Sequence, residues 1–407
     1  TDPERDLVFS RQTRNLIYLQ MKKLLSFFVL MCVSLSAMAS NTSVKNAEGV
    51  EIWYDFDSNT NTASVTYKGS KYSYDNEYTG EVVIPSTVTY KGVEYSVTSI
   101  GDYAFYYCSY LTSITLPESL TSIGDYTFDG CTALTSITLP EGLTSIGDYA
   151  FAWCYALTSI TIPEGVTSIG NDAFCGCYKL YEVYNKSDLT ITAGSTDNGY
   201  VAYYAKNVYT DSEGESKLKT VGDYIFYVDG EDIELIAYTG SETSITLPSD
   251  YEGKNYKIGY RAFYECDALT SITLPESLTS IGDYAFYNCY KLYEVYNKSD
   301  LTITAGSTDN GYVAYYAKNV YTDSEGESKL KTVGDYIFYV DGEDIELIAY
   351  TGSETSITLP SDYEGKNYNI GDYAFYDCNS LTSITLPEGV TSIGNCAFRE
   401  CYALTSI

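Results

Sequence analysis

One stretch decides the fold: residues 134–156 read LTSITLPEGLTSIGDYAFAWCYA. Nearly the same letters begin at Leu111 and Leu157, and they return at Leu269 and Leu381. The step between the first three copies is 23 residues, a period typical of leucine-rich and related solenoids. We therefore predict a repeat protein in which each copy forms one coil of a stack.

Each copy begins with the pattern of a short strand. Ile137 and Leu139 alternate with Ser136 and Thr138, so the two apolar side chains should face inward and the two hydroxyls outward. Pro140 cannot donate to a ladder of hydrogen bonds, so the strand should end there.

The second half of each copy has the pattern of a tight turn. We expect Gly147 to allow a sharp bend, and Asp148 to cap a single helical turn that carries residues 150–151. The copy after Ile258 reads IGYRAF instead of IGDYAF, and a looser turn is expected there.

A single coil cannot be stable alone. About six apolar side chains, worth about 2 kcal/mol each, cannot offset the ordering of one repeat at about 1–2 kcal/mol per residue. The coils must therefore stack, with parallel strands about 4.8 Å apart that hydrogen-bond from coil to coil.

Two copies carry a resemblance to a known family. Residues 111–131, LTSITLPESLTSIGDYTFDGC, and 381–401, LTSITLPEGVTSIGNCAFREC, resemble the BspA-type leucine-rich repeat of bacterial and protozoan surface proteins. The match covers eight I-G-x-x-A/T-F-x-x-C segments between Ile100 and Cys401. The resemblance implies a leucine-rich-repeat superhelix of short parallel strands with short helical turns, capped by an N-terminal β hairpin.

The start of the chain resembles a processing signal. Met21-Lys22-Lys23, the apolar run 24–35 and Ala37-Met38-Ala39 together predict a secretory signal peptide at 21–39, preceded by 1–20 as upstream sequence from a mis-assigned start. A lipoprotein signal at Cys32 is the alternative. Localisation is therefore expected to be secreted or at the cell surface.

The expected segments follow in order. They are a β cap (40–96), regular repeats (97–177), an irregular block (178–257), regular repeats (258–289), a second irregular block (290–369) and regular repeats with a truncated C-terminus (370–407).

The N-terminal cap should be a hairpin made of 50–54 and 63–67. Its turn, with Asp55 and Asp57, imitates the start of a calcium loop, but Thr60 and Thr66 stand where that loop needs Gly and Glu. We therefore favour a plain hairpin turn.

The irregular blocks are copies of each other. Residues 177–256 recur without change at 289–368. Each contains an Asp-Gly hairpin signal, at Asp229-Gly230 in the first. We predict that each block continues the solenoid as irregular coils.

Composition excludes several functions. The chain has no histidine, which removes Ser-His-Asp and Cys-His catalysis, so no enzyme, cofactor or metal site is predicted. The net charge is −31 and becomes −33 without 1–39, so nucleic acid and anionic membranes are poor partners.

Cysteines recur at the repeat step. Cys108, Cys131, Cys154 and Cys177 should form a buried ladder of reduced thiols, although disulfides between coils are an alternative. Cys175 and Cys396 lie off this ladder and are either redox-active thiols or partners for Cys177 and Cys401.

Two sets of side chains are candidates for ligand contact. The first is an outward array of hydroxyls that could bind ice or glycans, or could simply suit a solvated strand face. The second is tyrosines that leave the regular pattern, for either ligand contact or local packing. The candidates are Ser113, Thr115, Ser136, Thr138, Ser159, Thr161, Tyr200, Tyr203, Tyr204, Tyr312, Tyr315 and Tyr316, with Tyr209 and Tyr321 beside the tyrosines.

The predicted function is a non-catalytic exported binding protein with an extended repeat surface. By resemblance to the family, the ligand expected is a host matrix or cell-surface protein, or a glycan. The two identical blocks would give two equivalent contact zones. The alternative is a structural spacer that carries a further C-terminal domain.

Overall fold

The computed structural model describes residues 38–68, 78–210, 214–322 and 326–407. The chain divides into two compact units, Thr1–Gly214 and Glu215–Ile407, and each is described by itself. The predicted signal peptide at 21–39 lies outside the described residues except for its last two positions. None of the helices in the described ranges is long and apolar enough to cross a membrane.

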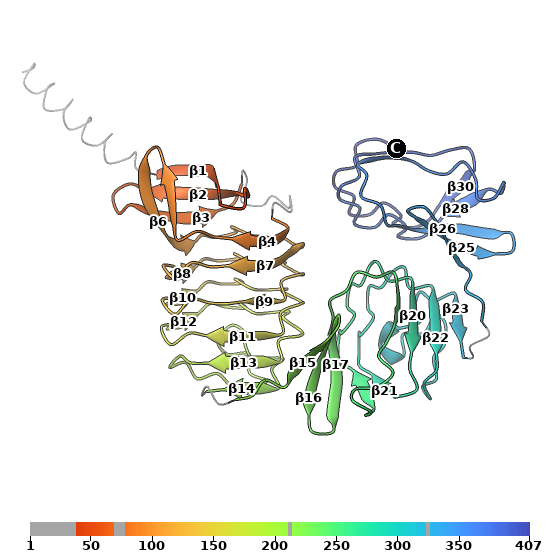
Figure 1. The fold of residues 1–407 in the computed structure, drawn as a ribbon, viewed down its shortest axis with the longest axis horizontal. Helices are drawn as coiled ribbons and strands as arrows, with labels where there is room; N and C mark the ends of the chain where they lie inside the picture. The colour runs from red at the N-terminus through yellow and green to blue at the C-terminus, as the bar shows by residue number, and fades with distance from the viewer. Residues whose placement is uncertain (1–37, 69–77, 211–213, 323–325) are drawn as a thin grey trace, which may run out of the picture. The chain divides into compact units, whose positions relative to one another are not determined.

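The first unit is a stack of coils, and most coils carry two short strands that pair in parallel with the strands of neighbouring coils (Figure 1). Ser113 lies opposite Ser136, and Ser145 lies between Ser122 and Ser168, so successive coils are in register at the 23-residue step, as predicted. The first strands of the coils are β4 (Gly80–Val83), β7 (Leu111–Thr115), β9 (Ser136–Ile137), β11 (Ser159–Ile162), β13 (Glu182–Asn185) and β14 (Asn207–Tyr209). The second strands are β6 (Val93–Ile100), β8 (Ser122–Ile123), β10 (Ser145–Ile146) and β12 (Ser168–Ile169).

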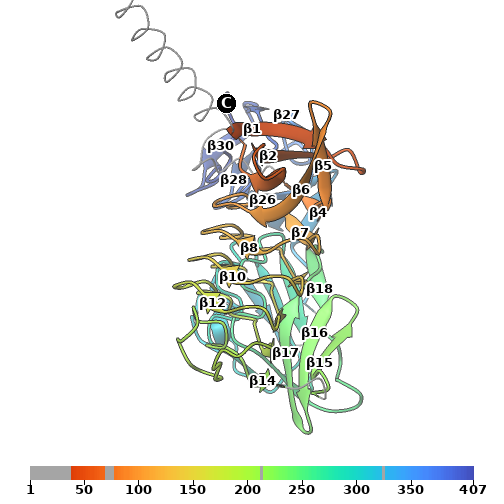
Figure 2. The same ribbon diagram turned by 90° about the vertical axis from the view of Figure 1, so that its left-hand side faces the viewer.

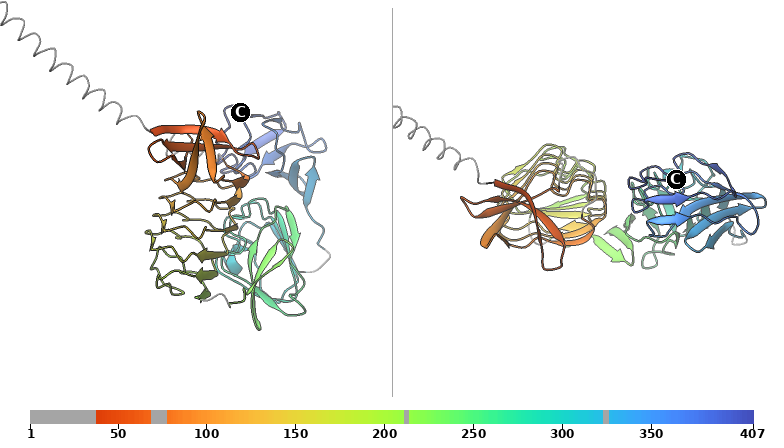
Figure 3. Two further views of the ribbon diagram at one scale, coloured as in Figure 1. Left: turned by 60° about the vertical axis from the view of Figure 1, so that its left-hand side comes forward. Right: turned by 90° about the horizontal axis from the view of Figure 1, so that it is seen from above.

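The interior of this unit is one continuous column of apolar side chains. Viewed from above in Figure 3, its coils superpose around that interior. Phe105, Phe128, Phe151 and Phe174 are fully buried and stack on one another with ring centroids 5.0–5.2 Å apart. Each ring contributes about 2–3 kcal/mol by burial, but only when a neighbouring coil covers it.

The turn after the second strand is not helical, contrary to the prediction. Tyr126 and Tyr149 have φ angles of 56° and 54°, in the left-handed region. Phe128 N–H donates to the carbonyl of Ala150 in the next coil, at 2.7 Å. These hydrogen bonds run between coils, which explains why no helical turn forms. In the described ranges, helix is limited to the 3₁₀ turn η1 (Asn310–Tyr312).

The Gly-Asp pair of each turn also acts between coils. A Cβ built on Gly147 would lie 2.5 Å from the carbonyl carbon of Gly124, so the glycine is needed for close approach of two backbones. Asp148 was expected to cap its own turn. Instead, its backbone N–H donates to Asp125 Oδ1 at 2.8 Å, and its own Oδ1 accepts from Asn171 N–H at 2.6 Å.

The N-terminal hairpin is present as predicted. It is formed by β2 (Glu51–Asp57) and β3 (Thr62–Thr66), with β1 (Met38–Lys45) antiparallel to β2. β3 then pairs in parallel with β6, and β5 (Thr87–Tyr90) pairs antiparallel with β6, so the cap joins the solenoid sheet (Figure 2). Asp57 Oδ1 accepts from the N–H of Asn59 at 2.8 Å, as in a plain hairpin turn.

The first irregular block differs from the prediction in its second half. β13 and β14 continue the parallel stack of the first unit. From residue 218 the chain forms an antiparallel ribbon instead of coils, and the predicted Asp-Gly hairpin is part of it. The ribbon pairs in parallel with the first coil of the second unit, as β3 does with β6. It consists of β15 (Leu218–Val221), β16 (Tyr224–Asp229) and β17 (Asp232–Tyr238), followed by β19 (Tyr256–Ile258).

The second unit contains two sets of coils, and each set is preceded by such a ribbon. The main clusters of buried side chains of the two sets are separate. Its first set of coils holds β18 (Ser244–Thr246), β20 (Ser271–Leu274), β21 (Leu278–Ile281), β22 (Glu294–Asn297) and β23 (Asn319–Tyr321). The duplicated ribbon is β24 (Leu330–Val333), β25 (Tyr336–Asp341) and β26 (Asp344–Tyr350). It precedes β27 (Ser356–Thr358), β28 (Tyr368–Ile370), β29 (Ser383–Thr385) and β30 (Val390–Ile393).

The close approach at the glycine column can be tested with Gly147→Ala. We expect a loss of about 1–3 kcal/mol in the free energy of unfolding, because the new methyl group collides with backbone that cannot move aside. Gly142→Ala is the control, since a Cβ there meets its nearest neighbour at 3.4 Å. Both tryptophans, Trp53 and Trp153, belong to the first unit, so fluorescence-monitored urea unfolding reports on that unit. Equal effects of the two changes would contradict the prediction.

Candidate functional site

The hydroxyl array occupies the outer face of the first strands. Thr115, Ser136 and Thr138 are exposed, and Ile114 and Ile137 between them are buried. The other three members, Ser113, Ser159 and Thr161, are half-buried. The array ends at β11, because the next strand sets Glu182 opposite Ser159 and Tyr184 opposite Thr161. The hydroxyls thus form a narrow lattice over three coils.

The irregular tyrosines of the first unit lie close together in the loop before β14. The ring centroids of Tyr200 and Tyr203 are 5.5 Å apart, and those of Tyr203 and Tyr204 are 4.8 Å apart. Tyr203 is 41% exposed. This cluster is therefore available for contact at its centre.

The cluster continues onto regular coils through residues that sequence reasoning missed. Tyr204 meets Tyr178 at 5.2 Å, and Tyr178 stacks on Tyr155 at 5.5 Å. Trp153, which is 39% exposed, lies 6.1 Å from Tyr155 and 6.2 Å from Tyr178. The sequence did contain a signal for Tyr155 and Tyr178: each directly follows a repeat cysteine, so the two rings recur at the same position of successive coils. We call the set Trp153, Tyr155, Tyr178, Tyr200, Tyr203 and Tyr204 the aromatic strip.

Trp153 is held in place by its backbone and by a small neighbour. Its φ angle is 58°, and a Cβ on Gly176 would lie 2.6 Å from the indole ring. The glycine in the following coil therefore lets the ring lie flat on the backbone. This packing places a large, rigid side chain at the surface at little entropic cost.

The duplicated loop of the second unit has different neighbours. Tyr312 stacks on Tyr284 at 5.5 Å and meets Tyr287 edge-on at 5.2 Å. Tyr315 lies 5.5 Å from Tyr312 and 4.8 Å from Tyr316. At the repeat offset, Tyr284 and Tyr287 replace Asp172 and Cys175, whereas Glu265 and Asp267 replace Trp153 and Tyr155. The two loops are identical, but their surroundings differ.

Tyr209 and Tyr321 contact buried groups of the fold and are not candidates for ligand contact. Tyr209 stacks on Tyr184 at 4.8 Å, and both hydroxyls donate to the fully buried carboxylate of Glu182, at 3.3 and 2.9 Å. The second unit repeats this arrangement around Glu294 with Tyr296 and Tyr321. A buried carboxylate needs such donors, so these tyrosines serve packing.

The turn after Ile258 keeps the left-handed conformation of the other turns but is looser at one bond, in line with the prediction: Arg261 N–H donates to Asp283 O at 3.3 Å, against 2.8–3.1 Å for the tyrosines at that position. Arg261 has a φ angle of 54°, like the tyrosines at that position, and Phe263 N–H donates to Ala285 O at 2.8 Å. The Arg261 guanidinium lies over the ring of Tyr264, 4.6 Å from its centroid. This cation–π contact places one positive charge among the tyrosines of the second unit.

The cysteine ladder is buried, and Cys131, Cys154 and Cys177 are free thiols. Cys131 Sγ donates to the carbonyl of Phe105 at 3.2 Å, and Cys154 and Cys177 make the same contact one and two coils further on. Burial raises the pKa of the Cys131 thiol far above its usual range. Off the ladder, Cys175 is half-buried and Cys396 is exposed, and both are free thiols.

Asp129 has the most unusual environment among the acids of the first unit. It is 6% exposed, and its Oδ1 has no hydrogen-bond partner among the described residues. Burial raises the pKa of this carboxyl from 3.8 to about 7. The shift has no catalytic partner such as histidine, so its consequence is for stability.

Asp129 should make the stability of the first unit depend on pH. Between about pH 4 and pH 7 the folded carboxyl keeps a proton that the unfolded chain has lost, so stability falls as pH rises through this window. Asp129→Asn should remove that fall and stabilise the unit by about 2 kcal/mol at pH 8. Tryptophan-monitored urea unfolding at several pH values is the measurement. Parallel pH profiles for the two proteins would contradict it.

Thiol labelling tests the cysteine arrangement. In the native protein, Cys396 should react with Ellman's reagent at least tenfold faster than the four ladder thiols, because only exposed thiolates are accessible. Cys396→Ser should remove the fast labelling at that position and leave any labelling at half-buried Cys401, whose pKa the hydrogen bond from Cys378 lowers to about 7, unchanged. Fast labelling of Cys131 or Cys154, located by mass spectrometry, would show that the ladder is open.

Comparison with solved structures finds bacterial leucine-rich repeat proteins. A leucine-rich cell surface protein of Faecalibacterium prausnitzii is 24% identical over 90% of this chain and 94% of its own, with a TM-score of 0.28. A leucine-rich repeat protein of Bacteroides ovatus is 25% identical over 87% and 92%, with a TM-score of 0.27. Comparison with curated proteins gives no match.

The family match is independent of these superpositions and covers most of the chain. The model of the BspA-type leucine-rich repeat region matches residues 67–197, 98–229, 232–358 and 343–407. The first of these stretches contains the coils that the structure stacks in register at the 23-residue step. The chain therefore belongs to the BspA-type leucine-rich repeat family.

Proposed function

We propose that this chain is a non-catalytic binding protein of the cell surface that holds a protein ligand through the aromatic strip. The observation that carries the proposal is the continuity of the strip. Trp153 and Tyr203 are 39% and 41% exposed and are joined through Tyr155, Tyr178 and Tyr204.

The chemistry of the strip suits a protein ligand. Tryptophan and tyrosine are enriched among residues that dominate binding energy at protein interfaces, because they combine large contact area with few rotatable bonds. Stacked coils present such side chains as an extended rigid surface, which is how solenoid proteins generally bind partners. The net charge of −31 favours a ligand surface that carries basic groups.

Several finer points belong to this proposal. The predicted signal peptide at 21–39 supports export, and the family resemblance supports a host matrix or cell-surface protein as ligand. The tyrosines of the second unit, with Arg261 beside them, would form a second contact zone that differs from the first. Simultaneous binding of both zones would raise the overall affinity.

The strip can be tested by alanine substitution in the mature chain. We expect Trp153→Ala and Tyr203→Ala each to weaken binding to immobilised laminin or collagen at least tenfold, the effect typical of a central aromatic contact. Tyr110→Ala is the matched control, because Tyr110 is 42% exposed in the same unit but is not part of the strip. Biolayer interferometry gives the dissociation constants, and circular dichroism verifies folding.

Other outcomes separate the alternatives. Saturable binding to a glycan array but not to any matrix protein would replace the protein ligand with a glycan. The absence of saturable binding to either would favour the structural spacer. Equal loss of affinity in Tyr110→Ala would show that the strip has no special role.

A further inference from the structure

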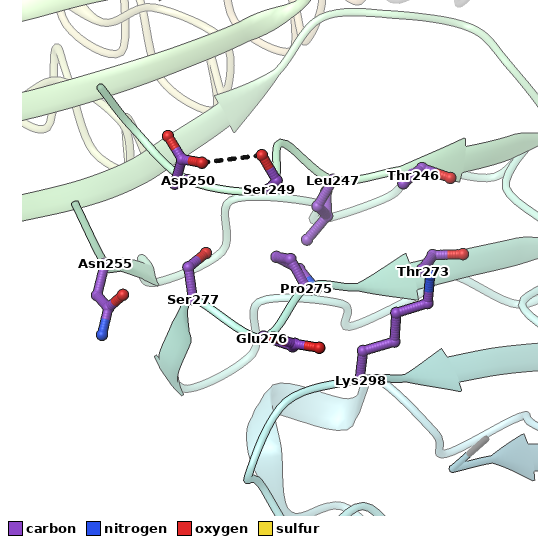
Figure 4. A pocket seen from close by; sticks show the side chains of 10 residues that line it. All are labelled: Thr246, Leu247, Ser249, Asp250, Asn255, Thr273, Pro275, Glu276, Ser277 and Lys298. Atoms are coloured by element: carbon purple, nitrogen blue, oxygen red, sulfur yellow. Dashed lines mark hydrogen bonds between the residues drawn. The ribbon is translucent and has the colours of Figure 1, made fainter. Parts of the chain in front are cut away.

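The two sets of coils in the second unit meet at an aromatic contact. The first set comprises β18 to β23, and the second comprises β27 to β30 together with the ribbon β24 to β26. The contact lies beside the starts of β20 and β22, at the opposite end of these strands from the pocket drawn in Figure 4. The apolar lining of that pocket is closed off, since Leu247 is 1% exposed, so the pocket offers mainly polar groups.

Stacked tyrosines form the centre of the contact. The ring of Tyr373 lies on that of Tyr290, with centroids 4.0 Å apart and planes 6° from parallel. Tyr376 meets Tyr290 edge-on at 5.0 Å, and Tyr373 meets Tyr316 edge-on at 6.3 Å. The turn 371–377 of the second set therefore covers tyrosines of the first set. We call this contact, which also includes Asp267, the joint.

The same tyrosine is covered differently in the first unit. Tyr178 is the copy of Tyr290, and Tyr155 of the preceding coil stacks on it. Asp267 stands at the position of Tyr155, and the second set supplies Tyr373 in its place. Tyr178 and Tyr290 are 8% and 9% exposed, so the two covers are equally complete. In the second unit, however, the cover comes from a set of coils with a core of its own.

Carboxyl groups from both sets gather at the joint. Asp267 is half-buried, and its Oδ1 is buried without a hydrogen-bond partner among the described residues. Glu265 faces Glu400 of the second set. Among the groups that face Asp267, one cation, Lys291, stands against two further carboxyls. The titratable groups that face Asp267 are Glu265, Cys266, Cys289, Tyr290 and Lys291 of the first set and Tyr376 and Asp377 of the second.

The closed joint favours the protonated form of Asp267. Burial raises the pKa of its carboxyl well above the usual range, the charge of Lys291 opposes this shift, and Glu265 and Asp377 add to it. Burial also raises the pKa of Glu265. Because Asp377 belongs to the second set, moving that set away removes its charge and returns water to Asp267. The closed joint thus holds a proton that the open joint releases, so opening becomes more favourable as pH rises.

A second contact between the two sets, through the ribbon, is matched in charge and hydrogen bonding. Glu294 of the first set accepts from the Ser328 hydroxyl and the Lys329 N–H, both at 2.8 Å. Glu346 of the ribbon pairs with Lys318 of the first set. This contact does not depend on a buried proton, so it can act as a hinge when the joint opens. Its apolar part is the cluster of Tyr293, Ile337, Tyr339, Ile348 and Ala349.

We propose that the joint is a pH-sensitive switch. It is closed while Asp267 holds a proton, and as pH rises the turn 371–377 moves away about the ribbon contact and uncovers Tyr290 and Tyr316. The uncovered tyrosines would enlarge the second contact zone, a consequence that rests on the proposed function, whereas the opening itself does not.

Hydroxyl-radical footprinting between about pH 5 and pH 8 tests the switch without any ligand. Oxidation of the Tyr290 side chain, located by mass spectrometry, should rise at least threefold relative to Tyr178, because opening exposes one ring and not the other. Peptides that contain the two tyrosines are distinct, since Asn288 and Gly176 precede the shared Cys-Tyr pair. Tyr373→Ala should raise Tyr290 oxidation already at the acidic end, because it removes the cover.

The proton is tested by Asp267→Asn, which should keep the joint closed and Tyr290 oxidation at its acidic level throughout. Asp129→Asn is the matched control, because Asp129 is also a buried acid with a raised pKa but belongs to the first unit. It should leave the rise at Tyr290 unchanged. Circular dichroism verifies that each variant is folded.

Three results would overturn the proposal. The first is Tyr290 oxidation that does not change with pH in the unaltered chain. The second is an equal rise in Asp267→Asn, and the third is a Tyr290 that stays protected in Tyr373→Ala. None of these measurements involves a binding partner, so failure here is distinguishable from failure of the aromatic strip.

Discussion

The structure depends on how closely the backbones of successive coils approach. At Gly147 there is no room for a single additional carbon atom, because the backbone of Gly124 lies directly beneath it. The backbone donors of the turn then find their acceptors in the next coil, as Phe128 N–H does with Ala150 O. Hydrogen bonding and aromatic stacking thus act along the same direction, from coil to coil. Neither would be satisfied in an isolated repeat, so stability is a property of neighbours.

This constraint confines variation to the outside of the coil. The phenylalanine, glycine and cysteine columns cannot change without loss of contact above and below, whereas the outer positions of the turn change freely between copies. Trp153 and Tyr155 give way to Glu265 and Asp267 one block later, while Tyr284 appears where Asp172 stands. The same tyrosine loop is therefore set in two different surfaces. Duplication has reproduced the loop but not the site.

The irregular block also shows how the open ends of a solenoid are covered. Its first half closes one stack, with Tyr184 and Tyr209 bound to the buried Glu182. Its second half, β15 to β17, forms an antiparallel ribbon with the same pairing order as the N-terminal cap. One duplicated block therefore contains both the end of one stack of coils and the ribbon that begins the next stack.

The sequence by itself determined the repeat, the register of the regular coils and the inward and outward faces, because these follow from a period of two within strands and 23 between coils. It also determined the N-terminal hairpin, from two strand-like runs on either side of a polar turn. It also identified Tyr200, Tyr203 and Tyr204 as residues outside the pattern. Only the tertiary structure decided the left-handed turns, the carboxylate of Asp148 shared between coils, and the union of Trp153 with the loop. These features arise from contacts between coils, for which one repeat carries no local signal.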